Sequence, residues 1–235
     1  MSPVQQPEAY SGVENLEIMQ EAVNYNRYLL NTVRKYAPLR GGGRILDFGA
    51  GNGEFVVPMS ALGFDVTAVE PDDLLRGRLH EKSVRAVAGP QELPDDSFAY
   101  VYTLNVLEHI EDDVATLRQL HSKLEVGGTV LIYVPAFPVL YTSMDAKVGH
   151  IRRYTRKTLA AAVTAAGFAI DDVAYVDSLG FFAALLFKAV GSKSGAVHRG
   201  ALRLYDALAF PVSRMLDVVT ARWFGKNLLL IARKS

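Results

Sequence analysis

The chain has 235 residues, half of them apolar, no cysteine, and equal numbers of acidic and basic residues. This length is enough for one well-filled domain spanning 1–235, and the missing cysteines exclude disulfides, thiolate metal sites and a cysteine nucleophile. The first residues lack the apolar centre of a signal peptide, and the longest apolar stretch, 179–187, is too short to span a bilayer. We therefore expect a soluble, cytoplasmic protein.

A helix is predicted over residues 13–37, because Leu16, Met19, Val23 and Leu30 recur at three- or four-residue spacing. Proline 38 and three consecutive glycines follow and end the pattern. We expect this N-terminal helix to cover the sheet formed by the later residues.

The next segment, residues 44–55 (RILDFGAGNGEF), predicts a buried strand, a glycine-rich turn and the start of a helix. Such a turn is a cradle for a nucleotide cofactor. The dinucleotide-binding pattern G-x-G-x-x-G would need a glycine at position 54, where this chain has Glu54. Asp47, just before the turn, is a poor neighbour for a pyrophosphate and a good one for an ammonium group.

The pattern D-x-G-x-G-x-G resembles motif I of the class I S-adenosylmethionine (SAM) dependent methyltransferases. The resemblance implies that the loop holds the methionine part of SAM through Asp47, Gly49, Ala50, Gly51 and Gly53. It also implies an α/β fold with a Rossmann-like seven-stranded sheet in the order 3-2-1-4-5-7-6, an antiparallel seventh strand, and helices on both faces.

In this family an upstream helix often closes over SAM, so Tyr25 and Asn26 are predicted cofactor contacts, with ordinary helix packing as the alternative. A second strand, 64–69, ends on Glu70, where this fold places a carboxylate that accepts the ribose hydroxyls. Pro71 follows in the same turn. A third strand, 84–88, leads into a turn whose residues frame the adenine in the family. At that turn the chain has Gln91 and Glu92, matched by position only, and a plain polar turn is the alternative.

The fourth predicted strand, 99–104, runs into Asn105-Val-Leu-Glu-His109. This N-x-L-E-H tract is similar to that of the ubiquinone-biosynthesis O-methyltransferases. We expect Asn105 to face the cofactor, since ligands bind at the carboxyl ends of strands. His109 either takes a proton from a hydroxyl acceptor or only orients and caps its neighbours. Some relatives hold a divalent metal with E-x-x-E-H. Here Asn105 replaces the first glutamate, so no metal is predicted.

A helix is predicted at 112–124 and a fifth strand at 129–134, followed by a long loop, 135–154, of the kind that is usually functional. The loop ends in G-H-x-R-R-Y, which resembles a recurring signature of type-11-like methyltransferases. In the functional interpretation, His150 or Tyr154 orients or deprotonates the acceptor. In the alternative, Arg152 and Arg153 pair with surface acids and Tyr154 packs before the next helix, 155–166.

The sixth and seventh strands are predicted at 170–176 and 227–233, with an apolar and basic helical insertion, 179–225, between them. From residue 179 onward the chain carries nine Lys or Arg against two Asp, so this part has a net charge of +7 and the rest has −7. An apolar stripe runs along the second helical segment through Leu204, Leu208, Val212, Met215 and Val219, with Pro211 as a kink or break. It caps an acceptor pocket, forms a homodimer interface, or contacts an anionic membrane through 179–222. Of these interpretations we favour the pocket cap, and a purely structural cover is the remaining alternative.

Taken together, the patterns predict a SAM-dependent methyltransferase acting on an oxygen or nitrogen of a small, lipid-like or aromatic acceptor. The alternatives are an NAD-linked oxidoreductase and a SAM-binding or membrane-surface protein without turnover. A neutral net charge gives no broad phosphate-binding surface, so no nucleic-acid partner is expected.

Overall fold

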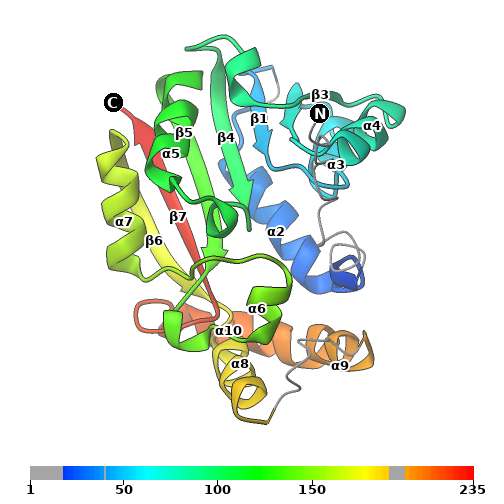
Figure 1. Ribbon diagram of the computed structural model, residues 1–235, viewed down its shortest axis with the longest axis vertical. Helices are drawn as coiled ribbons and strands as arrows, with labels where there is room; N and C mark the ends of the chain where they lie inside the picture. The colour runs from blue at the N-terminus through cyan, green and yellow to red at the C-terminus, as the bar shows by residue number, and fades with distance from the viewer. Residues whose placement is uncertain (1–17, 40, 191–198) are drawn as a thin grey trace, which may run out of the picture.

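The computed structural model describes residues 18–39, 41–190 and 199–235. A seven-stranded sheet in the order β3-β2-β1-β4-β5-β7-β6 forms its centre (Figure 1). The strands are β1 (Ile45–Phe48), β2 (Val66–Val69), β3 (Arg85–Val87), β4 (Phe98–Leu104), β5 (Leu124–Pro135), β6 (Phe168–Val176) and β7 (Asn227–Lys234). Neighbouring strands from β3 to β5 pair in parallel, and β7 lies antiparallel between β5 and β6. The predicted sheet order and antiparallel seventh strand are confirmed.

Helices cover both faces of this sheet. They are α2 (Val23–Tyr36), α3 (Val56–Ala61), α4 (Asp73–Glu81), α5 (Asp113–Lys123), α6 (Ser143–Lys147), α7 (Arg156–Ala165), α8 (Ser178–Val190), α9 (Arg199–Leu204) and α10 (Phe210–Thr220). Short 3-10 turns are η1 (Pro90–Glu92), η2 (Leu107–His109) and η3 (Pro138–Leu140), and η4 (Tyr205–Ala209) is a π-helical turn. The predicted N-terminal helix is present from Val23 onward, and residues 13–17 lie outside the described residues. The predicted long loop, 135–154, contains η3 and α6.

Side chains within the chain set the starts of several helices. Asp72 accepts a hydrogen bond from the Leu75 amide (2.9 Å) and caps α4. Thr155 accepts from the Thr158 amide (3.2 Å) and caps α7. Each cap satisfies an amide that has no partner within its own helix, which fixes where the helix begins.

Two apolar cores sandwich the sheet. One contains buried residues of α5 and α7, such as Leu117 and Leu159. The other contains residues of α2, α3 and α4, such as Val33, Met59 and Leu79. The central parallel strands β1 and β2 are buried along their whole length, as expected for parallel strands with helices on either face. The carboxyl edge of this sheet is therefore supported by packed apolar side chains on both faces.

The insertion between β6 and β7 consists of α8, α9, η4 and α10 in the described residues (Figure 1). Pro211 lies directly after η4, so the helix widens into a π-turn there and continues into α10. Two buried carboxylates attach this insertion to the domain. Asp206 accepts from the Asn24 and Tyr25 amides at the start of α2 (2.8 and 2.9 Å). Asp217 accepts from the Asp177 and Ser178 amides at the start of α8 (2.8 and 2.9 Å).

None of the described helices combines the length and apolar character needed to cross a bilayer. The inward position of the two carboxylates also turns the apolar stripe of the insertion outward, toward solvent.

Replacing Asp217 with alanine should destabilise the fold by about 2–4 kcal/mol, because two buried amides lose their acceptor. Urea unfolding of the purified protein would measure the loss. The matched control is Asp171→Ala, which removes a surface pair with Arg233 and should cost less than about 1 kcal/mol. Equal losses in the two variants would contradict the anchoring role of Asp217.

Candidate functional site

A cavity of about 510 Å³ opens at the carboxyl edge of the sheet, within the size range of small-molecule sites. It is lined by residues from α2, the glycine turn, the ends of β2 and β4, the loop 135–154 and the start of β7. The predicted site residues that line it are Tyr25, Asn26, Asp47, Gly49, Ala50, Gly51, Glu70, Pro71, Asn105, His109 and His150. The predicted site residues that do not line it are Gly53, Gln91, Glu92 and Tyr154.

The glycine turn needs glycine for two physical reasons. Gly49 and Gly53 have φ angles of 84° and 89°, which side chains disfavour. A Cβ at Gly49 would lie 2.3 Å from Cγ2 of Val106, and one at Gly53 would lie 2.8 Å from Cδ2 of Leu79. Gly53 thus packs the turn against α4, while Gly49 and Gly51 present bare backbone to the cavity.

Asp47 lies buried at the end of β1 with one side-chain hydrogen bond, which Oδ2 accepts from the Tyr102 hydroxyl (2.9 Å). Burial raises the pKa of Asp47 to about 7; the hydrogen bond from Tyr102 opposes the shift, and the charge of Glu70 adds to it. A carboxylate with so few donors is stabilised by a cation in the cavity beside it. The ammonium group of SAM fits this requirement.

Glu70 connects the glycine turn to the end of β2. Its Oε2 accepts from the Gly51 amide (2.8 Å) and its Oε1 from the Asp72 amide (3.0 Å). A carboxylate has about four lone-pair sites, so both oxygens can still accept hydroxyls. Burial raises the pKa of Glu70. This geometry fits the ribose-binding role predicted for Glu70.

Asn105 follows β4 with a φ of 56°, a left-handed conformation that asparagine tolerates better than most residues. Its amide donates to the Tyr133 carbonyl (2.8 Å), and its Nδ2 lies 3.5 Å from the Tyr25 hydroxyl. Because Asp206 fixes the start of α2, the Tyr25 ring is held over the same part of the cavity.

Gln91 and Glu92 lie in η1, away from the cavity. Oε1 of Glu92 accepts from the Ala88 and Gly89 amides (2.9 and 3.0 Å) and closes that turn. The alternative interpretation, a plain polar turn, therefore describes their geometry better than an adenine contact does.

Elsewhere in the cavity lining, His150 and Asp145 form a hydrogen-bonded pair. His150 Nδ1 lies 2.8 Å from Asp145 Oδ1, and a carboxylate can only accept, so Nδ1 carries the proton. In the neutral ring Nε2 then holds the lone pair. Arg153 donates to both oxygens of Asp145 (2.8 and 3.0 Å), and the Thr142 amide donates as well (2.8 Å). Burial opposes ionisation, but the hydrogen bonds from His150 and Arg153 outweigh it and hold the pKa of Asp145 well below its usual range.

His109 packs edge-on against His150, with ring centres 4.7 Å apart. Its Nδ1 donates to the Gly149 carbonyl (3.2 Å). Burial, with a contribution from His150, lowers the pKa of His109 to about 4. This ring is therefore neutral at physiological pH, and it supports His150 from the side.

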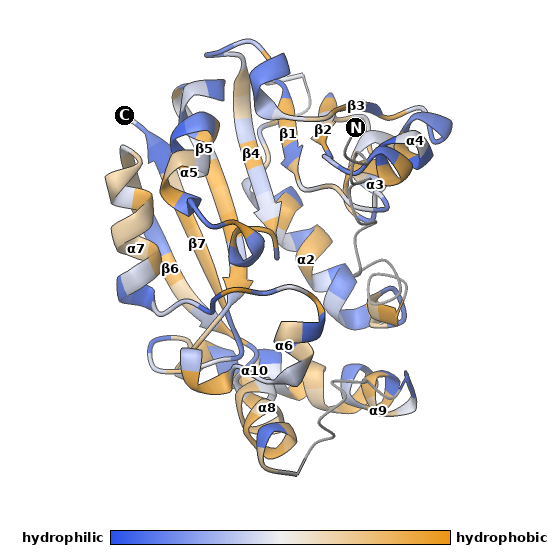
Figure 2. Ribbon diagram, in the orientation of Figure 1, coloured by the Kyte–Doolittle hydropathy of each residue, from blue (hydrophilic) through white to orange (hydrophobic). Residues whose placement is uncertain are grey.

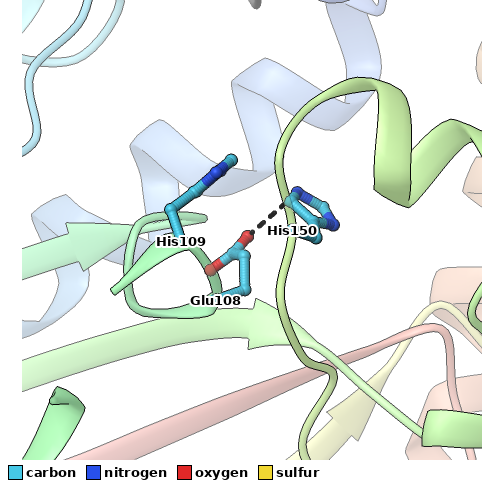
Figure 3. Close-up of side chains that lie close together, drawn as sticks. All are labelled: Glu108, His109 and His150. Carbon is cyan, nitrogen blue, oxygen red and sulfur yellow. Dashed lines mark ion pairs between the residues drawn. The ribbon is translucent and has the colours of Figure 1, made fainter. Parts of the chain in front are cut away.

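Glu108 lies beneath the two histidines, fully buried (Figure 3). Within the described part of the chain neither carboxyl oxygen has a hydrogen-bond partner, and Oε1 is 3.6 Å from His150 Nε2. Burial raises the pKa of Glu108 to about 8, although the charge of Arg153 opposes the shift.

Donor atoms of Glu108, His109 and His150 lie within 4.8 Å of one another. The sequence prediction of no metal counted only the first two residues, because His150 is distant along the chain. Three donors are too few for the oxygen-rich shells of Mg²⁺ or Ca²⁺, although a catalytic zinc uses three protein ligands. The absence of a metal stays a prediction.

Tyr154 is buried, and its hydroxyl donates to Asp113 Oδ2 (2.7 Å). Burial and the Asp113 carboxylate raise the pKa of Tyr154 well above its usual range. Arg152 pairs with the same carboxylate at 2.9 Å. The G-H-x-R-R-Y motif thus divides: His150 and Arg153 hold Asp145 beside the cavity, whereas Arg152 and Tyr154 hold Asp113 behind it. This position favours the packing alternative for Tyr154.

Asp145, Lys226 and Asn227 are among the cavity-lining residues that were not predicted from the sequence. The pattern Thr142-x-x-Asp145 is a capping signature that predicts a helix start but says nothing of His150. Lys226 and Asn227 reach the cavity because β7 is antiparallel, so its first residues arrive where β5 ends. The predicted direction of the seventh strand was the signal that could have identified them.

Affinity for S-adenosylhomocysteine should fall about tenfold from pH 8 to pH 6, because a carboxyl group with a pKa near 7 loses its charge over this interval. Calorimetric titration would measure it. Asp47→Asn should bind weakly at both pH values. Asp65→Asn, an exposed acid near β2, should keep the wild-type dependence. A pH dependence that persists in Asp47→Asn would assign it to another group.

Comparison with known proteins places these features in a family. The family profile described as "Methyltransferase domain" matches residues 19–173, more than half of the chain. A ubiquinone biosynthesis O-methyltransferase of Xanthomonas campestris is 36% identical over 101 residues, covering 39% of this chain and 42% of the relative. The aligned region thus spans less than half the length of that curated relative.

Solved structures share the fold. A SAM-dependent methyltransferase of Thermotoga maritima superposes with a TM-score of 0.65 at 15% identity, covering 97% of this chain and 99% of the other. Phosphoethanolamine N-methyltransferase 2 of Haemonchus contortus, in complex with SAM, superposes with a TM-score of 0.59 at 18% identity, covering 90% and 52%. The glycine turn, its carboxylates and the matched profile together set the NAD-linked alternative aside, and the chain belongs to the class I SAM-dependent methyltransferases.

Proposed function

We propose that the protein transfers a methyl group from SAM to a hydroxyl oxygen of a small acceptor with an apolar or aromatic body. The observation that carries this proposal is the Asp145–His150 pair, which lies in the same cavity as the glycine turn. A hydroxyl must lose a proton when it is methylated, and a positioned imidazole can accept that proton. The curated relative is named for O-methylation, which supports oxygen over nitrogen.

The residues at the glycine turn would hold the cofactor. Asp47 would bind its ammonium group, Glu70 its ribose hydroxyls, and Tyr25 would cover it from α2. When bound, SAM supplies a methyl group on a sulfonium and leaves as the thioether S-adenosylhomocysteine. The chain's contribution is to orient acceptor and cofactor in one cavity, which by itself accounts for a large part of such rate accelerations.

His150 would take the acceptor's proton at Nε2. Asp145 fixes the ring through Nδ1 and stabilises the imidazolium that forms, and Arg153 keeps Asp145 ionised. Ile110, Met144 and Val148 line the cavity as well. Such side chains favour an acceptor with an apolar body, and they exclude water from the reacting groups.

Replacing His150 with glutamine should lower kcat about 10²- to 10³-fold for hydroxyl acceptors, because the general base is lost. Affinity for S-adenosylhomocysteine should change less than about twofold, since His150 is outside the glycine turn. The measurement is methyl transfer from labelled SAM to catechol and to catechols with alkyl chains of increasing length.

Two controls accompany His150→Gln. His121→Gln changes a histidine outside the cavity and should leave kcat unchanged. Tyr154→Phe should also retain kcat, because the Tyr154 hydroxyl faces Asp113. The proposal fails if a protein that binds S-adenosylhomocysteine methylates phosphoethanolamine and no hydroxyl acceptor, or if Tyr154→Phe loses as much activity as His150→Gln.

Dialysis against a chelator should leave kcat unchanged, because the proposed proton transfer needs no metal. Metal content by mass spectrometry and activity before and after dialysis would be compared. Activity lost on chelation and restored by Zn²⁺ or Mg²⁺ would instead make Glu108, His109 and His150 metal ligands.

A further inference from the structure

The outward side of the insertion carries a continuous apolar surface. The residues are Leu204, Leu208, Met215, Val218, Val219 and Trp223, with exposed fractions of 61, 64, 74, 86, 64 and 67%. We call this set the insertion face. Figure 2 shows hydrophobic residues gathered on α8 and α10. None of these six residues lines the cavity, so the predicted role of the stripe as a pocket cap is wrong for the described structure.

Along α9, η4 and α10, most apolar side chains face outward and several polar side chains face inward, which is the reverse of the usual arrangement of a surface helix in water. The inward residues include the buried Asp206, Ser213 and Asp217, each with partners in the domain: Asp206 holds α2, Ser213 donates to Asp177 Oδ1 (2.8 Å), and Asp217 holds the start of α8. A solvated surface helix normally places apolar residues inward and polar residues outward. The hydrogen bonds determine which side faces in, so the outward apolar side is a fixed property of the fold.

The exposed charged residues of the described insertion are cationic. In the described stretches 178–190 and 199–226, the two acidic residues after Ser178, Asp206 and Asp217, are both buried. Lys188, Arg199, Arg203 and Arg222 are exposed in the same stretches. Arg199 and Arg203 pair on one side with Glu21. The insertion face is therefore complementary to an apolar surface bordered by negative charge.

We propose that the insertion face docks the protein on the surface of an anionic lipid bilayer. Apolar side chains would enter the boundary between head groups and acyl chains, and basic residues would contact the lipid phosphates. Trp223 suits this boundary because its ring is apolar and its N–H is polar. The contact is peripheral, in keeping with the finding that no helix in the described ranges is long and apolar enough to cross a bilayer.

A second copy of the chain fits the insertion face less well. A two-fold dimer brings the same surface against itself, so the exposed arginines of both copies would lie in one interface. The described insertion offers no exposed carboxylate to pair with them. Anionic head groups supply that missing charge, which is why the observations favour lipid.

Flotation with phosphatidylcholine vesicles, with and without phosphatidylglycerol, tests the proposal. Wild-type protein should bind the anionic vesicles and lose binding at high salt. Val218→Asp and Trp223→Asp should each weaken binding at least tenfold, and Arg222→Gln about fivefold. The matched control is Val126→Asp, a similarly exposed valine (76%, against 86% for Val218) near the start of β5 and outside the insertion, which should bind like wild type.

Unfolding midpoints and S-adenosylhomocysteine binding would show that each variant is folded, independently of any acceptor. No binding to anionic vesicles, equal binding to pure phosphatidylcholine, or an equal loss in Val126→Asp would overturn the proposal. So would a dimer in sedimentation velocity that Val218→Asp dissociates while vesicle binding is absent. If an aspartate variant does not fold, the Arg222→Gln and salt measurements still decide.

Discussion

A carboxylate that leaves water must receive hydrogen bonds or positive charge in return, because an uncompensated buried ion costs several kcal/mol. This constraint applies both in the insertion and in the loop 135–154. Asp206 and Asp217 receive backbone amides from helix starts, and Asp145 receives His150 and Arg153. Asp206 and Asp217 thereby join segments that are distant in sequence and fix the positions of α2 and α8. Asp145 instead ties together residues within the loop 135–154.

One acid that lines the cavity, Asp47, is compensated much less. Asp47 has a single side-chain donor, and its pKa rises from 3.8 to about 7. A shift of this size corresponds to about 4 kcal/mol of disfavoured ionisation. Because the folded-state pKa is the higher one, folding stability falls as the pH rises from about 4 toward 7. An ammonium group placed beside Asp47 would offset this cost. The charge of Asp47 therefore favours a cationic ligand in the cavity. Without such a ligand, the ionised carboxylate lowers the folding stability of the protein at neutral pH.

The sequence was informative where function depends on neighbours in the chain. The glycine turn, the acid after β2 and the caps at Asp72 and Thr155 are local patterns, and the structure contains all of them. The sequence did not show which side chains form hydrogen bonds with one another. Tyr154 and His150 are four residues apart, yet one faces Asp113 and the other Asp145. Asp113 lies at the start of α5, whereas Asp145 lies in α6, within the same loop as both side chains. Only the path of the loop across the sheet edge decides which side chain meets which acid.

The insertion shows the same limit for a surface. Its stripe of apolar residues was visible in the sequence. Helical periodicity shows which residues share one side of a helix, but it does not show whether that side packs inward or faces solvent. That choice is made by Asp206, whose partners Asn24 and Tyr25 lie about 180 residues earlier in the chain. Phe210, one turn further along, then packs on Tyr25 with ring centres 5.6 Å apart. Tyr25 also lines the cavity. The contacts of Asp206 and Phe210 with Tyr25 therefore turn the apolar face outward and also hold the start of α2 over the cavity. Cavity and insertion face are thus opposite sides of a single packed unit.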